Sequence, residues 1–297
     1  MVIARVFPSK TRYTPDDDLA LFGPPDMFSS ISGYDEIHVS CVFTWDKSKA
    51  ESLAEQWSHV CSTVKIGGPA FDDAGGVFTP GMYTKQGLII TSRGCPRRCP
   101  FCFVPKREGY LRELPVTIGN VVMDNNLLAC SDDHVARVFD MLGSQRHVTF
   151  QGGIDTYLLK DWHINRLAEL KGRLAYLYIA YDTDQDKDSV ESALVRLYLA
   201  GMKQRNIGCY VLIGYKGDTP EKAERRCEWA FSRGAIPFAM YYRGPSESVR
   251  IKKTKEWNAV YQRWCNLPSM FARIKREGLK QFPIVRGQFA DRSTQCQ

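Results

Sequence analysis

From Leu88 onward, short runs of hydrophobic residues alternate with amphipathic segments along the chain. Apolar runs of roughly four to eight residues are typical of buried strands, and amphipathic segments between them are typical of helices. Repeated strand–helix units predict a parallel sheet flanked by helices. We expect six strands, at residues 88–91, 120–123, 147–151, 174–181, 208–213 and 236–242, with helices such as 132–142 and 219–232 between them.

Secondary structure can also be predicted near both ends of the chain. Near the start we expect a strand at 36–43, a helix at 46–59 and a strand at 64–69 that ends in a glycine turn. Near the end, Trp257, Tyr261, Trp264 and Phe271 recur at helical spacings, which predicts a helix that covers the sheet. We therefore divide the chain into a small α/β region at 1–85, a core at 86–245 and a helical extension at 246–297.

Composition indicates a folded protein, because 44% of the residues are hydrophobic and 25% are charged. The N-terminal residues lack the apolar run of a signal peptide, and no segment approaches the roughly 20 apolar residues of a membrane span. We therefore expect a cytoplasmic protein that does not contact a membrane. In that compartment its ten cysteines are expected to be thiols rather than a disulfide framework.

Three cysteines, Cys95, Cys99 and Cys102, lie within eight residues, directly after the strand expected at 88–91. Two prolines and two arginines among them oppose a regular helix, so the cysteines are expected on one loop. Structural zinc normally takes four ligands, and no histidine lies between His59 and His134. Three thiolates suit a four-iron cluster better, with one iron left open to another ligand.

The spacing Cys-x3-Cys-x2-Cys, with Phe101 before the third cysteine, resembles the signature of radical S-adenosylmethionine (radical SAM) enzymes. The resemblance covers roughly residues 86–245. It implies an α/β fold with a partial (βα)6 TIM-like barrel, preceded by a truncated Rossmann-like region similar to the end of a cobalamin-binding domain. Cobalamin itself is not expected, because the Asp-x-His-x-x-Gly loop that supplies the lower cobalt ligand in many such domains is absent.

The resemblance also implies an activity. One 4Fe-4S cluster would be held by the three loop cysteines, S-adenosylmethionine would bind its open iron, and reductive cleavage would give a 5'-deoxyadenosyl radical that abstracts a substrate hydrogen. An external electron donor of the flavodoxin or ferredoxin type would be required. The cofactor would supply the reactive chemistry, and the protein would supply binding and orientation.

Further cofactor contacts are implied by position after the predicted strands. They are Phe101, Asp124, Asn125, Asp182, Gly214, Asp218 and Met240. Asp124 and Asn125 stand where many family members carry Gly-Gly-Glu, although a plain Asx turn would also explain them. Asp182 suits the ribose hydroxyls or a helix N-cap. The segment with Gly214 and Asp218 resembles the family's adenine-binding region, and Met240 fits either that pocket or core packing.

Other residues are assigned to the substrate side on thinner grounds. They are Gln151 and Asp155 after the third strand, Cys130 and Tyr181 as candidate hydrogen-atom donors, and Arg243 as an anion contact. A small buried hydrophobic residue is the favoured explanation of Cys130. A miscounted strand would exchange the assignments of Asp124 and Asp155 between cofactor and substrate.

The positive charge of the chain does not identify the substrate. The net charge is +7, and Arg93, Arg97, Arg98, Lys106, Arg107 and Arg112 surround the cysteine loop, where they could screen a cluster or receive an anionic substrate. A nucleic acid, a nucleotide or a small metabolite remains possible, and the reaction after hydrogen abstraction is not defined by the sequence. The alternative from another class is a non-catalytic iron–sulfur or zinc protein that uses the loop as a structural or sensing site.

Overall fold

The computed structural model describes residues 1–27, 29, 33–73, 76–244 and 254–265. The chain forms two compact units, Met1–Gln145 and Arg146–Gln297. Of the predicted helical extension, residues 254–265 are described, and Phe271 lies outside the described part. The division at residues 85 and 245 stays a prediction.

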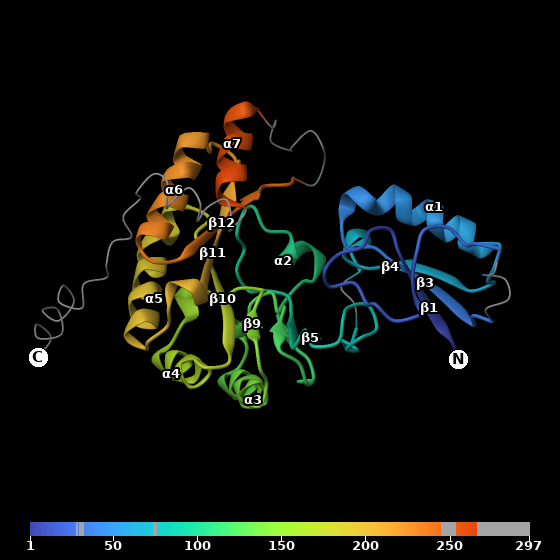
Figure 1. Ribbon diagram of the computed structural model, residues 1–297, viewed down its shortest axis with the longest axis horizontal. Helices are drawn as coiled ribbons and strands as arrows, with labels where there is room; N and C mark the ends of the chain where they lie inside the picture. Colours follow the sequence, from blue (N-terminus) through green and yellow to red (C-terminus); the bar gives the residue numbers. More distant parts are fainter. Residues whose placement is uncertain (28, 30–32, 74–75, 245–253, 266–297) are drawn as a thin grey trace, which may run out of the picture. The chain divides into compact units, whose positions relative to one another are not determined.

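The first unit contains a four-stranded parallel sheet with the strand order β2-β1-β3-β4 (Figure 1). Its strands are β1 (Ile3–Phe7), β2 (Ala20–Phe22), β3 (Glu36–Ser40) and β4 (Val64–Gly67), and helix α1 (Lys47–Ser58) follows β3. The expected strands at 36–43 and 64–69 and the helix at 46–59 are confirmed. The sequence reading missed β1 and β2.

Helix α1 covers this small sheet with one apolar side. Ala50, Leu53 and Trp57 lie at helical spacing and are buried, together with Ile37 and Val39 of β3. The Trp57 indole N–H donates to the Gly23 carbonyl at 3.1 Å, so the polar atom of this buried ring is also satisfied. The first unit thus has its own hydrophobic core.

The remainder of the first unit carries the cysteine loop. The short strands β5 (Leu88–Ile89) and β8 (Val121–Val122) pair in parallel, and β6 (Ser92–Arg93) and β7 (Arg112–Glu113) pair antiparallel. Helix α2 (Val104–Arg107) follows the cysteines, and α3 (Asp132–Gly143) follows β8. The Ser131 side chain caps α3 by accepting from the backbone N–H of His134.

The second unit contains four neighbouring strands in the order β12-β11-β10-β9. Its strands and helices are β9 (Val148–Phe150), α4 (Asp161–Glu169), β10 (Leu174–Ala180), α5 (Lys187–Leu199), β11 (Ile207–Ile213), α6 (Pro220–Ser232), β12 (Ile236–Tyr241) and α7 (Lys255–Trp264). Adjacent strands from β9 to β12 are parallel. All six predicted strands and the two named helices are present, so the α/β class with a parallel sheet is confirmed. A TIM-like barrel stays a prediction.

Single turns of 3-10 helix occur between several elements. They are η2 (Thr44–Asp46), η3 (Pro69–Phe71), η4 (Leu127–Ala129), η5 (Thr156–Leu158), η6 (Asp184–Asp186) and η7 (Gln204–Asn206). Three of them, η4, η5 and η6, follow the carboxyl end of a strand at places where the sequence positions candidate site residues.

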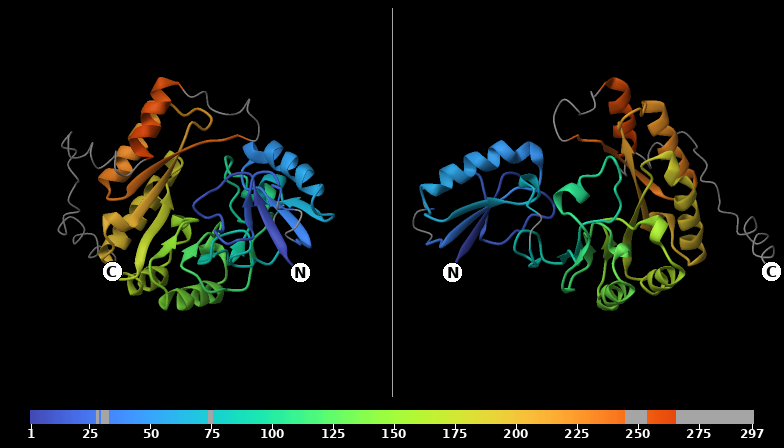
Figure 2. Two further views of the ribbon diagram at one scale, coloured as in Figure 1. Left: turned by 45° about the vertical axis from the view of Figure 1, so that its right-hand side comes forward. Right: turned by 180° about the vertical axis from the view of Figure 1, so that it is seen from behind.

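Strands β10 and β11 each have two distinct faces. Leu177, Ile179, Cys209 and Val211 are fully buried, and Figures 1 and 2 show α4, α5 and α6 along one face of this sheet. On the opposite face of β11, Gly208 makes room for the ring of Tyr178, because a Cβ at Gly208 would lie 2.5 Å from that ring. This alternation is the period-two pattern expected of strands.

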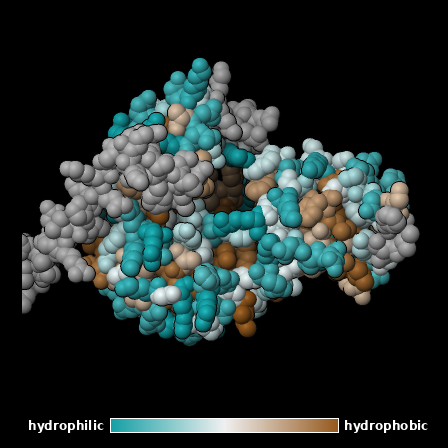
Figure 3. All heavy atoms as spheres, in the orientation of Figure 1, coloured by the Kyte–Doolittle hydropathy of each residue, from teal (hydrophilic) through white to brown (hydrophobic). Residues whose placement is uncertain are grey.

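No described helix is long and apolar enough to cross a membrane. Several exposed hydrophobic residues belong to the first unit, among them Val42, Ile66 and Val77, and brown atoms are visible on its surface in Figure 3. Singly exposed apolar side chains are ordinary on folded proteins, so they carry no functional argument.

Candidate functional site

The cysteine loop leaves the sheet through a turn that requires glycine. Gly94 has φ +82°, and a Cβ at this position would lie 2.2 Å from the carbonyl oxygen of Tyr110. The Gly94 N–H donates to Asn125 Oδ1 at 3.0 Å and to Glu108 Oε2 at 3.2 Å. The chain therefore turns sharply just before Cys95, and two side chains hold the turn.

The three thiols differ in environment. Cys95 and Cys99 are half-buried and Cys102 is exposed. The Cys102 N–H donates to the Cys99 carbonyl at 3.0 Å, which makes a tight turn between these two cysteines. Among the described residues, no group of three or more His, Cys, Asp or Glu side chains is placed to hold a metal ion. One loop thus carries all three thiols, and the cluster stays a prediction.

Asn126 supplies an observation that fits a cluster. This side chain is 4% exposed, and its Nδ2 donates to the Cys95 sulfur at 3.5 Å. Hydrogen bonds to cysteine sulfurs are one of the ways in which proteins set the potential of an iron–sulfur cluster. The donor set of three thiolates with an N–H directed at one sulfur therefore suits a 4Fe-4S cluster, although the sequence reading did not single out Asn126.

Asp124 lies beneath the loop and is 1% exposed. Its carboxylate accepts from the Thr91 N–H and the Thr91 hydroxyl, each at 2.5 Å, and from the Ser92 N–H at 3.1 Å. Burial raises the pKa of Asp124, and the hydrogen bonds from Thr91 and Ser92 offset part of that effect. Asp124 and Asn125 both contact the backbone that leads into the loop, so each has a positioning role in this structure. Their predicted contact with a cofactor stays a prediction.

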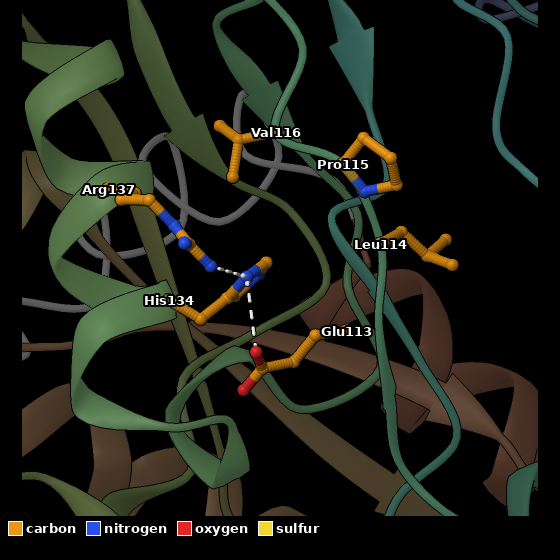
Figure 4. A pocket seen from close by; sticks show the side chains of 6 residues that line it. All are labelled: Glu113, Leu114, Pro115, Val116, His134 and Arg137. Atoms are coloured by element: carbon orange, nitrogen blue, oxygen red, sulfur yellow. Dashed lines mark hydrogen bonds and ion pairs between the residues drawn. The ribbon is translucent and has the colours of Figure 1, made fainter.

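His134 extends the network below the loop toward a pocket. It is completely buried in the first turn of α3, and its Nε2 lies 3.3 Å from the Thr91 hydroxyl. Its Nδ1 lies 3.5 Å from Arg137 and 3.7 Å from Glu113 (Figure 4). With Nε2 protonated, the imidazole donates to Thr91, and Thr91 in turn donates to Asp124. A chain of hydrogen bonds therefore connects the start of the cysteine loop to the pocket that His134 lines.

The pocket has a volume of about 450 Å³. Its lining consists of Glu113, Leu114, Pro115, Val116, His134 and Arg137 (Figure 4). The sequence reading missed it, because its polar residues come from β7 and α3, which are separated along the chain. The only available signal was the Ser131 N-cap, which places His134 in the first turn of a helix.

Cys130 lies close to the same network. It is 7% exposed, and burial raises its pKa to about 11, with a smaller opposing effect from the Ser92 side chain. The side chain is therefore a protonated thiol at neutral pH. A protonated thiol is the form that can donate a hydrogen atom, but the structure equally suits a small buried side chain.

In the second unit, Gln151 is joined to an aromatic side chain. Its Nε2 donates to the Tyr210 hydroxyl at 2.5 Å, and that hydroxyl donates to the Gln151 carbonyl at 3.0 Å. Tyr210 also stacks on Tyr178, with ring centroids 4.5 Å apart and an interplanar angle of 9°. Asp155 accepts from the Tyr157 N–H at 3.1 Å and caps η5. The assignment of Gln151 and Asp155 to a substrate site stays a prediction.

Tyr181 and Asp182 follow β10. Tyr181 is 3% exposed, makes an edge-on ring contact with Trp229 at 4.9 Å, and has a pKa raised to about 12 by burial. Asp182 accepts from the Leu212 N–H at 3.1 Å. The N-cap of η6 is Thr183 rather than Asp182, and Asp186 completes the capping box by accepting from the Thr183 N–H at 2.8 Å and from its hydroxyl at 3.0 Å.

Gly214 and Asp218 form the loop after β11. Gly214 has φ +79°, and its N–H donates to Asp218 Oδ2 at 2.8 Å. Asp218 also forms an ion pair with Arg226 of α6, with hydrogen bonds of 2.9 Å and 3.0 Å, and both side chains are 8% exposed. Arg226 further donates to the Leu212 carbonyl at 2.8 Å. The loop is therefore anchored by a buried ion pair whose cation the sequence reading did not identify.

Three further predicted residues are half-buried or exposed. Met240 of β12 is half-buried and pairs with Leu212 of β11. Phe101 is half-buried in the cysteine loop, and Arg243 is exposed after β12. Their proposed contacts with cofactor or substrate stay predictions.

The chain matches no protein family model and no curated protein sequence.

Proposed function

We propose that this protein is a radical SAM enzyme. The observation that carries the proposal is the loop with Cys95, Cys99 and Cys102, which is entered through Gly94 and receives a hydrogen bond from Asn126 at a cysteine sulfur. The loop follows a parallel strand, β5, as expected for a site at the carboxyl end of such strands. The number and spacing of the thiols, and the hydrogen bonds around their loop, support this proposal.

When bound, a 4Fe-4S cluster and S-adenosylmethionine would supply a 5'-deoxyadenosyl radical for hydrogen abstraction. The chain's own residues prepare that site. Asp124 and Asn125 hold the backbone that enters the loop, and Asn126 directs an N–H at the Cys95 sulfur. Because a thiolate accepts such a bond more strongly as its charge grows, Asn126 favours the reduced state of a cluster held by Cys95.

Cys130 is the chain's best-placed thiol for a hydrogen-atom donor in the first unit. It is buried next to Ser92, at the start of the cysteine loop, and it stays protonated at neutral pH. The reaction is one that begins with hydrogen abstraction by this radical. Its substrate is a nucleotide, a nucleic acid or a small metabolite.

The proposal is tested by anaerobic reconstitution of the full chain with iron and sulfide. Mössbauer and electron paramagnetic resonance spectra report the cluster, and chromatography with mass spectrometry reports 5'-deoxyadenosine after addition of dithionite and S-adenosylmethionine. We expect a 4Fe-4S signal and 5'-deoxyadenosine in the wild type and neither in Cys99→Ala. Cys227→Ala is the matched control, because Cys227 is buried in α6 outside the loop.

The outcomes distinguish the candidate functions. A cluster without binding of S-adenosylmethionine would support the non-catalytic iron–sulfur protein instead. Loading of zinc alone, with a rise in melting temperature, would support a structural metal site. Equal 5'-deoxyadenosine from Cys99→Ala would contradict the assignment of this loop.

A further inference from the structure

The strand pair β6–β7 joins the pocket of Figure 4 to the cysteine loop. Glu113 of β7 lines the pocket and pairs with Ser92 of β6, the strand that leads into the loop. Leu114, also in the pocket wall, donates its N–H to the Thr91 carbonyl at 2.8 Å. A third lining residue, His134, lies 3.3 Å from the Thr91 hydroxyl. Three residues of the pocket wall therefore contact the segment where the loop begins.

The polar residues of the pocket place a positive and a negative group close together. Arg137 Nη2 lies 3.5 Å and Glu113 Oε2 lies 3.7 Å from the same atom, His134 Nδ1. Figure 4 shows both side chains directed at this imidazole, with no ion pair between Arg137 and Glu113. Burial would raise the pKa of Glu113, but hydrogen bonds from Ser131 outweigh this effect and lower the pKa below its usual value. The carboxylate is therefore ionised at neutral pH.

The rest of the lining is aliphatic and consists of Leu114, Pro115 and Val116, three consecutive residues directly after β7. A phosphate or nucleotide would bring several negative charges beside Glu113. A nucleobase would find no Phe, Tyr or Trp ring to stack on among the described residues that line the pocket. A divalent metal ion would have a single carboxylate next to a guanidinium. The lining thus suits a small zwitterion with an apolar side chain.

We propose that this pocket binds a free α-amino acid with an aliphatic side chain, and that the bound molecule stabilises the start of the cysteine loop. Arg137 donates to the carboxylate, Glu113 accepts from the ammonium group, and the side chain packs against the aliphatic wall. An α-amino acid separates its two charged groups by one carbon atom, which matches a cation and an anion within 3.7 Å of one nitrogen. The volume of about 450 Å³ lies in the range of small-molecule sites.

The effect on the loop follows from where the pocket residues lie. The lining comes from residues 113–116 and from α3, and both segments contact Thr91 or Ser92. Local opening that separates these segments destroys the pocket, so a ligand that binds only the closed form makes opening less favourable. The pocket and its ligand are independent of the proposed function. Only the benefit for a cluster at the cysteine loop rests on that function.

Isothermal titration calorimetry of the full chain, before reconstitution, tests the ligand class. It compares L-leucine with two compounds that each lack one of its charges. 4-Methylpentanoate lacks the ammonium group, and 3-methylbutylamine lacks the carboxylate. We expect L-leucine to bind at least about tenfold more tightly than either compound, because each compound loses one hydrogen-bonded charge pair.

Two variants assign the charges to residues. Arg137→Gln should weaken the Kd of L-leucine by about tenfold or more, but it should not weaken binding of 3-methylbutylamine, which has no carboxylate. Glu113→Gln should weaken L-leucine to a similar extent and should not weaken 4-methylpentanoate. The amide oxygen of this variant can still accept from the Ser131 N–H. The matched controls Arg225→Gln and Glu51→Gln, at exposed positions of α6 and α1, should leave the Kd within about twofold.

Hydrogen exchange of the full chain, read by mass spectrometry, tests the effect on the loop. With L-leucine at about ten times its Kd, amides of residues 90–94 should exchange about tenfold more slowly, whereas those of α1 should be unchanged. No binding of L-leucine, or equal affinity for the three compounds, would overturn the amino-acid site. Binding without slower exchange at residues 90–94 would overturn the effect on the loop. Formation of 5'-deoxyadenosine is measured separately on reconstituted protein, so a failure of the pocket is distinguishable from a failure of the proposed function.

Discussion

Asp124 accepts two hydrogen bonds from Thr91, one from its backbone N–H and one from its hydroxyl, each at 2.5 Å. The two residues are 33 positions apart, and each lies two residues after the end of one of two paired parallel strands, β5 and β8. The carboxylate therefore ties together the carboxyl ends of both strands at the point where the cysteine loop begins. This makes the loop geometry depend on a residue outside the loop.

Removal of this carboxylate should weaken both the fold and the loop. In Asp124→Ala, two buried N–H groups and one hydroxyl lose their acceptor, so we expect the free energy of unfolding to fall by about 1–3 kcal/mol. Iron content after reconstitution should fall as well. Urea denaturation and iron analysis measure the two effects. Asp133→Ala, an exposed aspartate of α3, should change the free energy by less than about 0.5 kcal/mol; an equal loss in both variants would contradict the role of Asp124.

The charge of Asp124 should appear in the pH dependence of stability. Burial raises the pKa of Asp124 in the folded chain, so its proton is held more tightly there than in the unfolded chain. Its contribution to stability is therefore fully present below the ordinary aspartate pKa of about 3.9 and is lost as pH rises through the raised value. We expect wild type to lose stability relative to Asp124→Asn over this range. A relative gain with rising pH would show that the hydrogen bonds outweigh burial.

Gly94 and Gly109 provide a matched pair of substitutions in the first unit. Both have positive φ, +82° and +72°, but a Cβ at Gly94 would lie 2.2 Å from a backbone carbonyl, whereas a Cβ at Gly109 would meet nothing within 4 Å. Gly109→Ala should cost only the conformational strain of about 1–2 kcal/mol. Gly94→Ala should cost more and should abolish cluster loading, because the loop must move. Thermal denaturation and iron content test this, and equal effects of the two variants would refute it.

The buried ion pair of Asp218 and Arg226 should show strong coupling. Asp218→Ala leaves a cation that is 8% exposed without its partner, so we expect a loss of about 3–5 kcal/mol. The double variant Asp218→Ala, Arg226→Met should lose less than the sum of the single changes, because it removes the unpaired charge. Urea denaturation of the four proteins in a double-mutant cycle measures the coupling. Additive losses would mean that the pair contributes through packing alone.

Thiol reactivity should separate the cysteines of the first unit. Cys102 is exposed, whereas Cys130 is 7% exposed and burial raises its pKa to about 11. In the iron-free protein at pH 8, iodoacetamide should alkylate Cys102 quickly and leave Cys130 unmodified, since the thiolate is the reactive form. Peptide mass spectrometry over time identifies the order of modification. Equally fast labelling of Cys130 would show that its segment opens readily.

The strands β5 and β8 to β12 were predictable because each is a short apolar run bounded by polar or glycine-rich segments. The strand β1 was not predictable in this way. Arg5 interrupts its apolar run, although this side chain is buried and donates to Asp17 at 2.6 Å. A charge reads as a surface position in a sequence, and only the folded chain shows the acidic partner that permits its burial.

The site residues also divide into those that the sequence predicted and those whose contacts only the folded chain shows. The position and spacing of Cys95, Cys99 and Cys102 are local properties, so the sequence alone determined that one loop carries three thiols. The tertiary structure decided that Asp124 and Asn125 hold this loop, that Asn126 donates to a cysteine sulfur, and that His134 joins the network. These contacts join residues about 30 to 40 positions apart, and such pairings arise only when parallel strands bring their carboxyl ends to one edge of a sheet.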